Sequence, residues 1–205
     1  MTSQKTGQGT DARETRYRRL IELGIALSSE RNHNRLMEMI LLGAKELTNA
    51  DGGTLYLTSD PGRELLFKIV RTDSLGIALG GTTGRAVVFP PVQLFNDAGE
   101  PNHKNVSSHA ALTGSTINIV DAYDTDKFDF TGTKAFDAKT GYRSTSFLTV
   151  PLKNHGGDVV GVLQLLNARD TSGKTVAFSA EITPLIEALA SQAAVALDNQ
   201  MLLDA

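Results

Sequence analysis

Hydrophobic residues near the start of the chain recur every three or four positions, which is the spacing of an amphipathic helix. One such segment runs from residue 12 to about residue 29, and a second follows Asn32, a candidate N-cap, and stops at the sequence NADGG. The apolar positions are Tyr17, Leu20, Leu23 and Leu27 in the first segment, and Leu36, Ile40, Gly43 and Leu47 in the second. Residues 1–11 are polar and contain glycine, so we expect a disordered lead-in there.

The spacing then shortens to that of β-strands. TLYLT (54–58) and ELLFKIV (64–70) are joined by SDPGR, whose Asp-Pro-Gly is typical of a turn, so we predict a hairpin. The glycine-rich residues 72–84 read as a loop. The segment 87–95 is an edge strand or an irregular arm, because Pro90 and Pro91 lack backbone donors.

In the second half of the chain, the sequence pattern predicts a further hairpin with helices before and after it. We expect a short helix at 105–114, a strand at 115–121, short helices and turns over 121–142, and paired strands at 144–152 and 159–167. The last segment, 178–205, is a helix that starts at Thr183 before Pro184, or at Ser179. Strands joined by hairpins, with no βαβ repeat, predict an α+β domain with an antiparallel sheet.

Composition excludes several classes of function. The chain has 20 Lys and Arg against 23 Asp and Glu. Its net charge of −3 does not favour binding to nucleic acid or to an anionic membrane. No segment is apolar enough to span a bilayer or to act as a secretion signal, so we expect a cytoplasmic protein. The absence of cysteine excludes disulfides, thiolate metal sites and thiol catalysis.

Three patterns suggest chemistry, but none meets its requirements. The sequence GIALGGTTG contains glycines suited to a phosphate loop, yet no lysine follows in register, so we interpret it as a turn. Four aspartates lie between 121 and 129, but Asp129 stands where a calcium loop needs glycine, and Ala135 where it needs glutamate. The four histidines lack zinc spacing, and no G-x-S-x-G motif occurs. We therefore expect no metal and no enzymatic activity.

Residues 140–170 carry a family resemblance. The sequences Thr140-Gly141-Tyr142-Arg143-Ser144, PLKN at 151–154 and VVGV at 159–162, preceded by INIVDAY at 117–123, resemble the GAF domains of cyclic-nucleotide phosphodiesterases. The longer arm around residues 73–114 is similar to GAF domains that precede HD-GYP phosphodiesterases and nucleotide cyclases in bacterial proteins. The resemblance implies a six-stranded antiparallel sheet with the terminal helices on one face. On the other face, segment 105–142 would roof a ligand pocket.

The resemblance also implies where a small molecule would bind. The implied ligand-binding residues are Thr54, Val70, Arg71, His109, Asp121, Ala122, Tyr123, Thr140, Ser144 and Gln164. Tyr123 would stack on a ring, Thr140 and Ser144 would donate to an oxyanion, and Gln164 would bind an amide-like edge. The alternative for Tyr123 is packing within the roof, and for Asp121 it is capping of a helix.

The chain departs from the cyclic-nucleotide signature N-K…F…D-E. Ala168 follows Asn167 in place of lysine, and Ser179-Ala180 follow Phe178 in place of the acidic pair, so the lysine–aspartate bridge of that signature cannot form. This weakens the expectation of cyclic AMP or GMP and leaves another non-covalent metabolite open. Without cysteine, the bilin-linked and methionine-sulfoxide-reducing branches are excluded.

We therefore expect a small-molecule-sensing regulatory domain of a bacterial signalling protein. Residues 12–177 would form the sensor, and 178–205 a connector helix to an output domain outside the chain, of HD-GYP phosphodiesterase or nucleotide-cyclase type. The terminal helices would form a homodimer through an alanine-rich face. Its residues are Ala188, Ala190, Ala193, Ala194 and Ala196. The alternative is a ligand-free module for dimerisation and spacing, its pocket filled by its own side chains.

Overall fold

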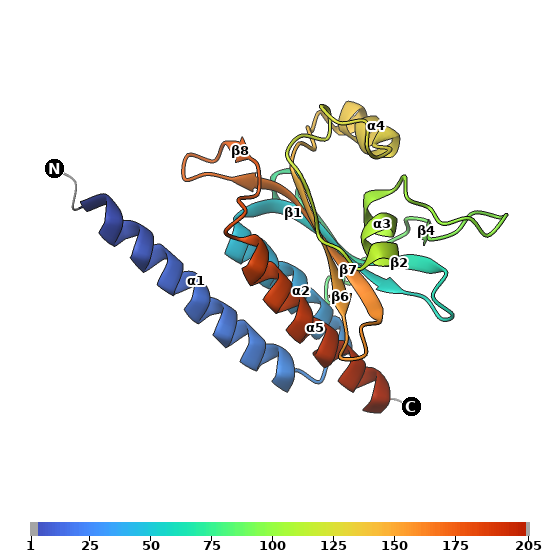
Figure 1. Cartoon of the computed structure of the whole chain (residues 1–205), viewed down its shortest axis with the longest axis horizontal. Coiled ribbons are helices and arrows are strands. Elements are labelled where there is room, and N and C mark those ends of the chain that lie inside the picture. Colours follow the sequence, from blue (N-terminus) through green and yellow to red (C-terminus); the bar gives the residue numbers. More distant parts are fainter. Residues whose placement is uncertain (1–3, 204–205) are drawn as a thin grey trace.

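The computed structural model describes residues 4–203 and shows helices on both faces of a twisted sheet (Figure 1). The helices α1 (Gln4–Ser29), α2 (His33–Thr48) and α5 (Thr183–Leu203) cover one face, with α2 and α5 against the sheet and α1 outside them. The shorter α3 (Val106–Thr113) and α4 (Thr131–Thr140) lie over the other face. The predicted α+β class is confirmed.

The sheet is antiparallel throughout, and its main path has six strands, as predicted. Their order is β3-β2-β1-β7-β6-β5, with β4 paired to β2 and β8 paired to β7. The strands are β1 (Ala50–Thr58), β2 (Glu64–Thr72), β3 (Ile77–Gly80), β4 (Val92–Gln93), β5 (Ile117–Ile119), β6 (Phe147–Lys153), β7 (Val159–Arg169) and β8 (Thr175–Val176). Both predicted hairpins are present, as β1–β2 and β6–β7.

Alternation along the central strand β7 divides the apolar residues between two faces. Leu163 and Leu165 are fully buried in the core that the sheet forms with α1, α2 and α5. Val162 and Leu166 belong to two smaller clusters under α3 and the roof segments. Since successive side chains of a strand point to opposite faces, one strand contributes to both the core and the roofed side.

Most predicted helix ends are confirmed by their caps. Asn32 caps α2 by accepting from the Arg35 backbone N–H at 2.9 Å, and α5 begins at Thr183 rather than Ser179. For α3, Asn105 accepts from the Ser108 N–H, and Gly114 ends the helix with φ +64°, a conformation suited to glycine. These local signals fix the beginning and the end of α3.

Two predictions of irregular structure were wrong. Residues 4–11 are helical and extend α1 where we expected a disordered lead-in; residues 1–3 lie outside the described part. Glutamine and lysine favour helix, and the segment continues without a break into the amphipathic pattern that starts at Ala12, which offsets the cost of two glycines. The expected loop 72–84 contains a 3-10 turn (Asp73–Leu75) and β3, which pairs with β2.

The segment 87–95 forms less structure than a strand. Only Val92–Gln93 pairs with the sheet, because the preceding Pro90 and Pro91 cannot donate to a ladder. This short strand, β4, lies at the edge of the sheet beside β2, as expected for part of the segment, and β3 pairs with the other end of β2.

Among the helices of residues 4–203, none is both long and apolar enough to cross a membrane.

Shortening a core-facing side chain of β7 tests whether the two faces of this strand are divided between the core and the roofed side. Leu163→Ala should lower the free energy of unfolding by about 2 to 5 kcal/mol, since Leu163 is fully buried and a cavity would remain. Leu202→Ala, at an exposed position of α5, should change it by less than about 0.5 kcal/mol. Urea denaturation of both variants measures the difference, and equal values would contradict the assignment of Leu163 to the core.

Candidate functional site

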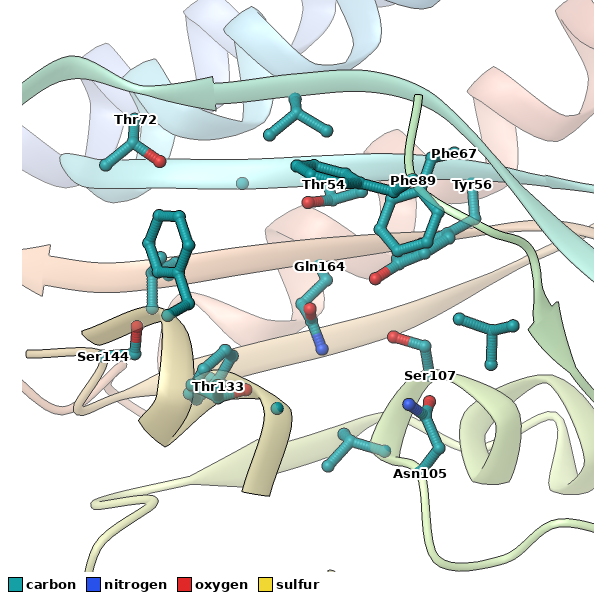
Figure 2. A pocket seen from close by; sticks show the side chains of 18 of the residues that line it. Thr54, Tyr56, Phe67, Thr72, Phe89, Asn105, Ser107, Thr133, Ser144 and Gln164 are labelled. Atoms are coloured by element: carbon teal, nitrogen blue, oxygen red, sulfur yellow. The ribbon is translucent and has the colours of Figure 1, made fainter. Parts of the chain in front are cut away.

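A cavity of about 340 Å³ lies between the sheet and the segments that cover its second face (Figure 2). Its floor comes from β1, β2, β6 and β7, and its roof from the first turns of α3 and α4. The polar lining side chains are Thr54, Arg71, Thr72, Asn105, Ser107, Asp129, Thr133, Ser144 and Gln164, and the aromatic ones are Tyr56, Phe67, Phe89, Phe130, Phe136 and Phe147. A concave site with a few polar groups among apolar walls suits a small organic ligand.

Gln164 presents the amide group at the floor of the pocket. Its Nε2 donates to the fully buried Thr149 Oγ1 at 3.1 Å, which holds the side chain in place. Within residues 4–203, its Oε1 accepts no hydrogen bond, so the carbonyl remains available to a donor on a ligand. Thr54 is the β1 partner of Gln164 in the sheet register, so its hydroxyl lies beside the amide.

Two helix N-termini face the same cavity. Asn105 and Ser107 line it at the start of α3, and Asp129 and Thr133 line it at the start of α4. Backbone N–H groups in the first turn of a helix carry partial positive charge and favour an anionic or carbonyl group. At α4 this position is shared with Asp129, whose Oδ1 accepts from the Thr131 N–H at 2.9 Å.

Aromatic rings gather at one end of the pocket. The Tyr56 and Phe67 centroids are 4.6 Å apart, and Phe67 meets Phe89 edge-on at 5.4 Å. Burial raises the pKa of Tyr56 to about 12, against the opposing effect of a hydrogen bond with Ser107, so its hydroxyl stays neutral at physiological pH. This end offers flat apolar surface beside Ser107 at the start of α3, and the other lining rings, Phe130, Phe136 and Phe147, lie elsewhere in the pocket.

Five of the ten residues implied by the family resemblance line the cavity. They are Thr54, Val70, Arg71, Ser144 and Gln164. The Arg71 guanidinium, however, forms a buried ion pair with Glu38 and donates to the Leu79 carbonyl at 2.8 Å. Its charge is therefore already neutralised within the protein.

The other five lie outside the lining of the cavity and make contacts within the roof. His109 hydrogen bonds to His103 through Nδ1 atoms 2.8 Å apart, and Ala122 is fully buried in the apolar cluster under the roof. Thr140 donates to the Phe136 carbonyl of its own helix. These contacts stabilise the covering segments.

Tyr123 and Asp121 make contacts within the roof, but Asp121 does not cap a helix as the alternative for it proposed. The Tyr123 hydroxyl donates to Asp137 Oδ2 at 2.6 Å, and the Arg143 guanidinium lies 4.1 Å above the Tyr123 ring. Asp121 accepts from the Tyr123 backbone N–H at 2.9 Å and pairs with Arg143 at 3.1 Å. Asp121 therefore caps a turn, and Tyr123 packs at the outer surface of the roof, where 36% of the residue remains exposed.

Sequence reasoning missed most of the aromatic lining. Tyr56 lies two residues after Thr54 on β1, so strand periodicity alone places it on the same face. Phe130 and Phe136 belong to the polar segment 121–142, where no period indicated which residues point inward. Asn105 was included in the predicted helix 105–114, but its place over the pocket depends on the tertiary fold.

The glycine-rich loop surrounds an internal carboxylate. Thr82 donates through Oγ1 to Glu38 Oε2 at 2.6 Å, and the Arg71 guanidinium pairs with the same carboxylate. This explains why GIALGGTTG resembles an anion-binding sequence without its lysine. Among residues 4–203, no group of three or more His, Cys, Asp or Glu is arranged to hold a metal ion.

A buried polar network joins the end of the roof to the sheet. Asp51, at the start of β1, accepts from Tyr142 Oη and Ser74 Oγ at 2.6 Å each, and pairs with Arg169 at 3.2 Å. Asn167 donates to Tyr142 Oη at 2.9 Å and accepts from the Thr145 N–H at 2.7 Å. Four separate segments therefore meet at one carboxylate.

An antiparallel sheet with helices on one face and a roofed pocket on the other defines a sensory regulatory domain. The chain belongs to the GAF domain family, whose sequence profile matches residues 32–197.

Similar proteins include large phosphodiesterases. The chain is 29% identical over 150 residues to the dual 3′,5′-cyclic-AMP and -GMP phosphodiesterase 11 of Drosophila melanogaster, covering 72% of this chain and 10% of that protein. It is 28% identical over 152 residues to the cGMP-specific 3′,5′-cyclic phosphodiesterase of Drosophila mojavensis, covering 72% and 12%. The chain thus spans about a tenth of these relatives.

Solved structures share the fold at low sequence identity. The GAF domain of an Acinetobacter phosphoenolpyruvate-protein phosphotransferase superposes with a TM-score of 0.66 at 14% identity, over 93% of this chain and 97% of that one. The free methionine-R-sulfoxide reductase of Neisseria meningitidis, in complex with its substrate, gives 0.61 at 14% identity, over 90% and 89%.

The Asp51 network should make stability depend on acid pH. Burial by itself raises the pKa of Asp51, but hydrogen bonds from Ser74 and Tyr142, with the nearby Arg169, hold it below its ordinary value. Because the folded pKa is lowered, the charge stabilises the fold above about pH 4 and loses this effect as pH falls through the folded pKa. Asp51→Asn should lower the free energy of unfolding by about 1 to 3 kcal/mol at pH 7.

Urea denaturation of both proteins at several pH values measures this effect. The difference should shrink as the pH falls below about 4. Asp158→Asn, at an exposed turn, serves as the control. A difference that stays constant down to the acid transition would contradict an ionised Asp51.

Proposed function

We propose that this GAF domain is a small-molecule sensor that regulates an attached output domain in a cytoplasmic bacterial signalling protein. The output domain would lie outside the chain and be a cyclic-di-nucleotide phosphodiesterase of HD-GYP type or a nucleotide cyclase. The single observation that carries the proposal is the roofed pocket, which has space for a ligand and hydrogen-bonding groups directed into it. The bacterial context rests on the resemblance of the arm around residues 73–114 to GAF domains of bacterial signalling proteins.

The alternative, a ligand-free dimerisation and spacing module, is less well supported. Such a module would fill the site with its own apolar side chains. Here Gln164 and Thr54 lie on the floor of a cavity of about 340 Å³. Polar groups among apolar walls favour a ligand, because they offer it hydrogen bonds that a site packed with apolar side chains would lack.

The ligand would bind without a covalent bond, since the chain has no cysteine. The pocket suits a molecule with a planar ring and a polar or anionic group. The ring would lie against Tyr56, Phe67 and Phe89, and the polar group would bind to the Gln164 amide or to the N-termini of α3 and α4. Cyclic AMP and cyclic GMP are candidates, because the relatives include a phosphodiesterase named for both. The missing lysine and acidic pair of the cyclic-nucleotide signature weaken this expectation and leave other ring-containing metabolites open.

Regulation would work by a shift in population. A ligand that contacts both the floor and the roof favours the closed arrangement of the roof over any open one. The Tyr142–Asp51 hydrogen bond joins the roof to the start of β1, which directly follows α2. A change in the roof can therefore reach the helical layer that continues to the output domain.

Ligand binding should depend on the Gln164 amide. In Gln164→Leu the hydrogen bond to a bound ligand is lost, so affinity should fall about tenfold or more for any ligand of the wild type. Isothermal titration with cyclic AMP and cyclic GMP, together with a thermal-shift screen of metabolites, measures this. Gln93→Leu, at an exposed position of β4, should bind normally. A wild-type domain that binds nothing in the screen would refute the sensor proposal.

We also propose that the domain forms a homodimer, through a different surface from the one expected. Ala190, Ala193, Ala194 and Ala196 are buried in the core of their own chain, so the alanine face is not available for the dimer. A stripe on α1 replaces it, formed by Tyr17, Ile21 and Ile25, with 50%, 62% and 64% of each residue exposed. Large apolar residues exposed at helical spacing favour a protein partner.

Charges in the α1 stripe should disrupt such a dimer. The double variant Ile21→Lys/Ile25→Lys should be monomeric by size-exclusion chromatography with light scattering, because like charges would face each other across the two-fold axis. Val120→Lys, at an exposed position of the roof side, should remain dimeric. A monomeric wild type at all concentrations, or a dimeric double variant, would rule out this interface.

A further inference from the structure

The two sides of the roof are attached to the sheet in different ways. On the α4 side, Asp137 of the helix accepts from both the backbone N–H and the hydroxyl of Ser144, each at 2.8 Å. The adjoining Tyr142 hydrogen bonds to Asp51 and Asn167. Opening the pocket on this side would break several buried hydrogen bonds at once, which is costly.

The opposite side is covered by residues 86–91, which we name the strap. One anchor is the hydrogen bond from the Gly80 N–H to the Arg85 carbonyl at 2.7 Å, and the other is the β4 pairing of Val92 with Leu65. Between these anchors the strap contains no helix or strand, and it makes no hydrogen bond to the rest of residues 4–203. Two of its residues are prolines, which restrict the backbone and remove donors.

Phe89 is the strap residue that lines the pocket. Its ring meets Phe67 edge-on at 5.4 Å, and 44% of the residue remains exposed, so it lies at the boundary between the cavity and solvent (Figure 2). The neighbouring Val88 is 84% exposed and points away. The middle of the strap is thus held over the pocket by apolar contact and not by hydrogen bonds.

We infer that ligands enter and leave the pocket under the strap, and that Phe89 is the gate residue. Lifting the strap breaks one aromatic contact and exposes part of one ring, whereas lifting α4 breaks the bonds of two buried carboxylates. Since both anchors stay in place when the strap moves, the sheet and the pocket floor are undisturbed. The inference deepens the proposed sensor function, because Phe89 would set how fast the sensor responds.

A single cysteine in the pocket provides a test that requires no ligand. The chain has no cysteine of its own, so Thr54→Cys introduces one thiol on the pocket floor. Its rate of reaction with 5,5′-dithiobis(2-nitrobenzoate) reports how often the pocket opens wide enough to admit an aromatic disulfide. Thermal midpoints of every variant verify that the domain remains folded.

Three variants in the Thr54→Cys background separate the two routes. Phe89→Ala should raise the labelling rate constant about tenfold or more, since it removes the contact that holds the strap down. Val88→Ala and Tyr142→Phe should each stay within about twofold of the parent, the first because Val88 points outward and the second because α4 is not the route.

Several outcomes would overturn the inference. They are an unchanged rate in Phe89→Ala, a larger increase in Tyr142→Phe than in Phe89→Ala, and a thiol that does not react in any variant. Because the test uses no natural ligand, a domain that binds no metabolite would refute the sensor proposal while leaving the gate result intact.

Discussion

The alternation of side chains along β7 is the constraint on which the rest of this domain depends. Leu163 and Leu165 complete the core with the helices, while Gln164, between them, faces the opposite side. A shift of register by one residue would exchange the two sets, placing an amide in the core and leucines in the pocket. Core stability and pocket chemistry are therefore determined by the same pairing of β7 with β1 and β6.

The segments over the second face of the sheet are held by two small apolar clusters and by buried polar networks. The carboxylates of Asp51 and Asp137 each collect donors from segments that are distant in sequence or position. Such networks fix geometry well because each unsatisfied member would be costly. The strap lacks them, so the roof combines a firmly attached side with one held by an aromatic contact.

Asn167 is the one residue of the N-K pair in the cyclic-nucleotide signature that this chain retains, and in the structure it holds the segment that follows α4. The expected lysine–aspartate bridge is absent from the sequence, yet Asn167 still organises the segment after α4 by bonding to Tyr142 and Thr145. Arg169, two residues later, pairs with Asp51. The signature lysine would stand at Ala168, next to Arg169. The Arg169–Asp51 ion pair thus lies close to that position and connects the end of β7 to the network that holds the roof.

Local patterns in the sequence determined the two hairpins, the capped helix α3 and the α+β class, because turns, caps and strand periodicity depend on residues near one another in the chain. They also placed Thr54 and Gln164 on strands, and resemblance assigned them to a pocket. Only the tertiary structure decided that Tyr123 packs at the outer surface of the roof, that Arg71 is neutralised by Glu38, and that the alanines of α5 are buried. Each of these depends on contacts between segments far apart in sequence, where the partner of a side chain is set by how the layers pack and not by its neighbours.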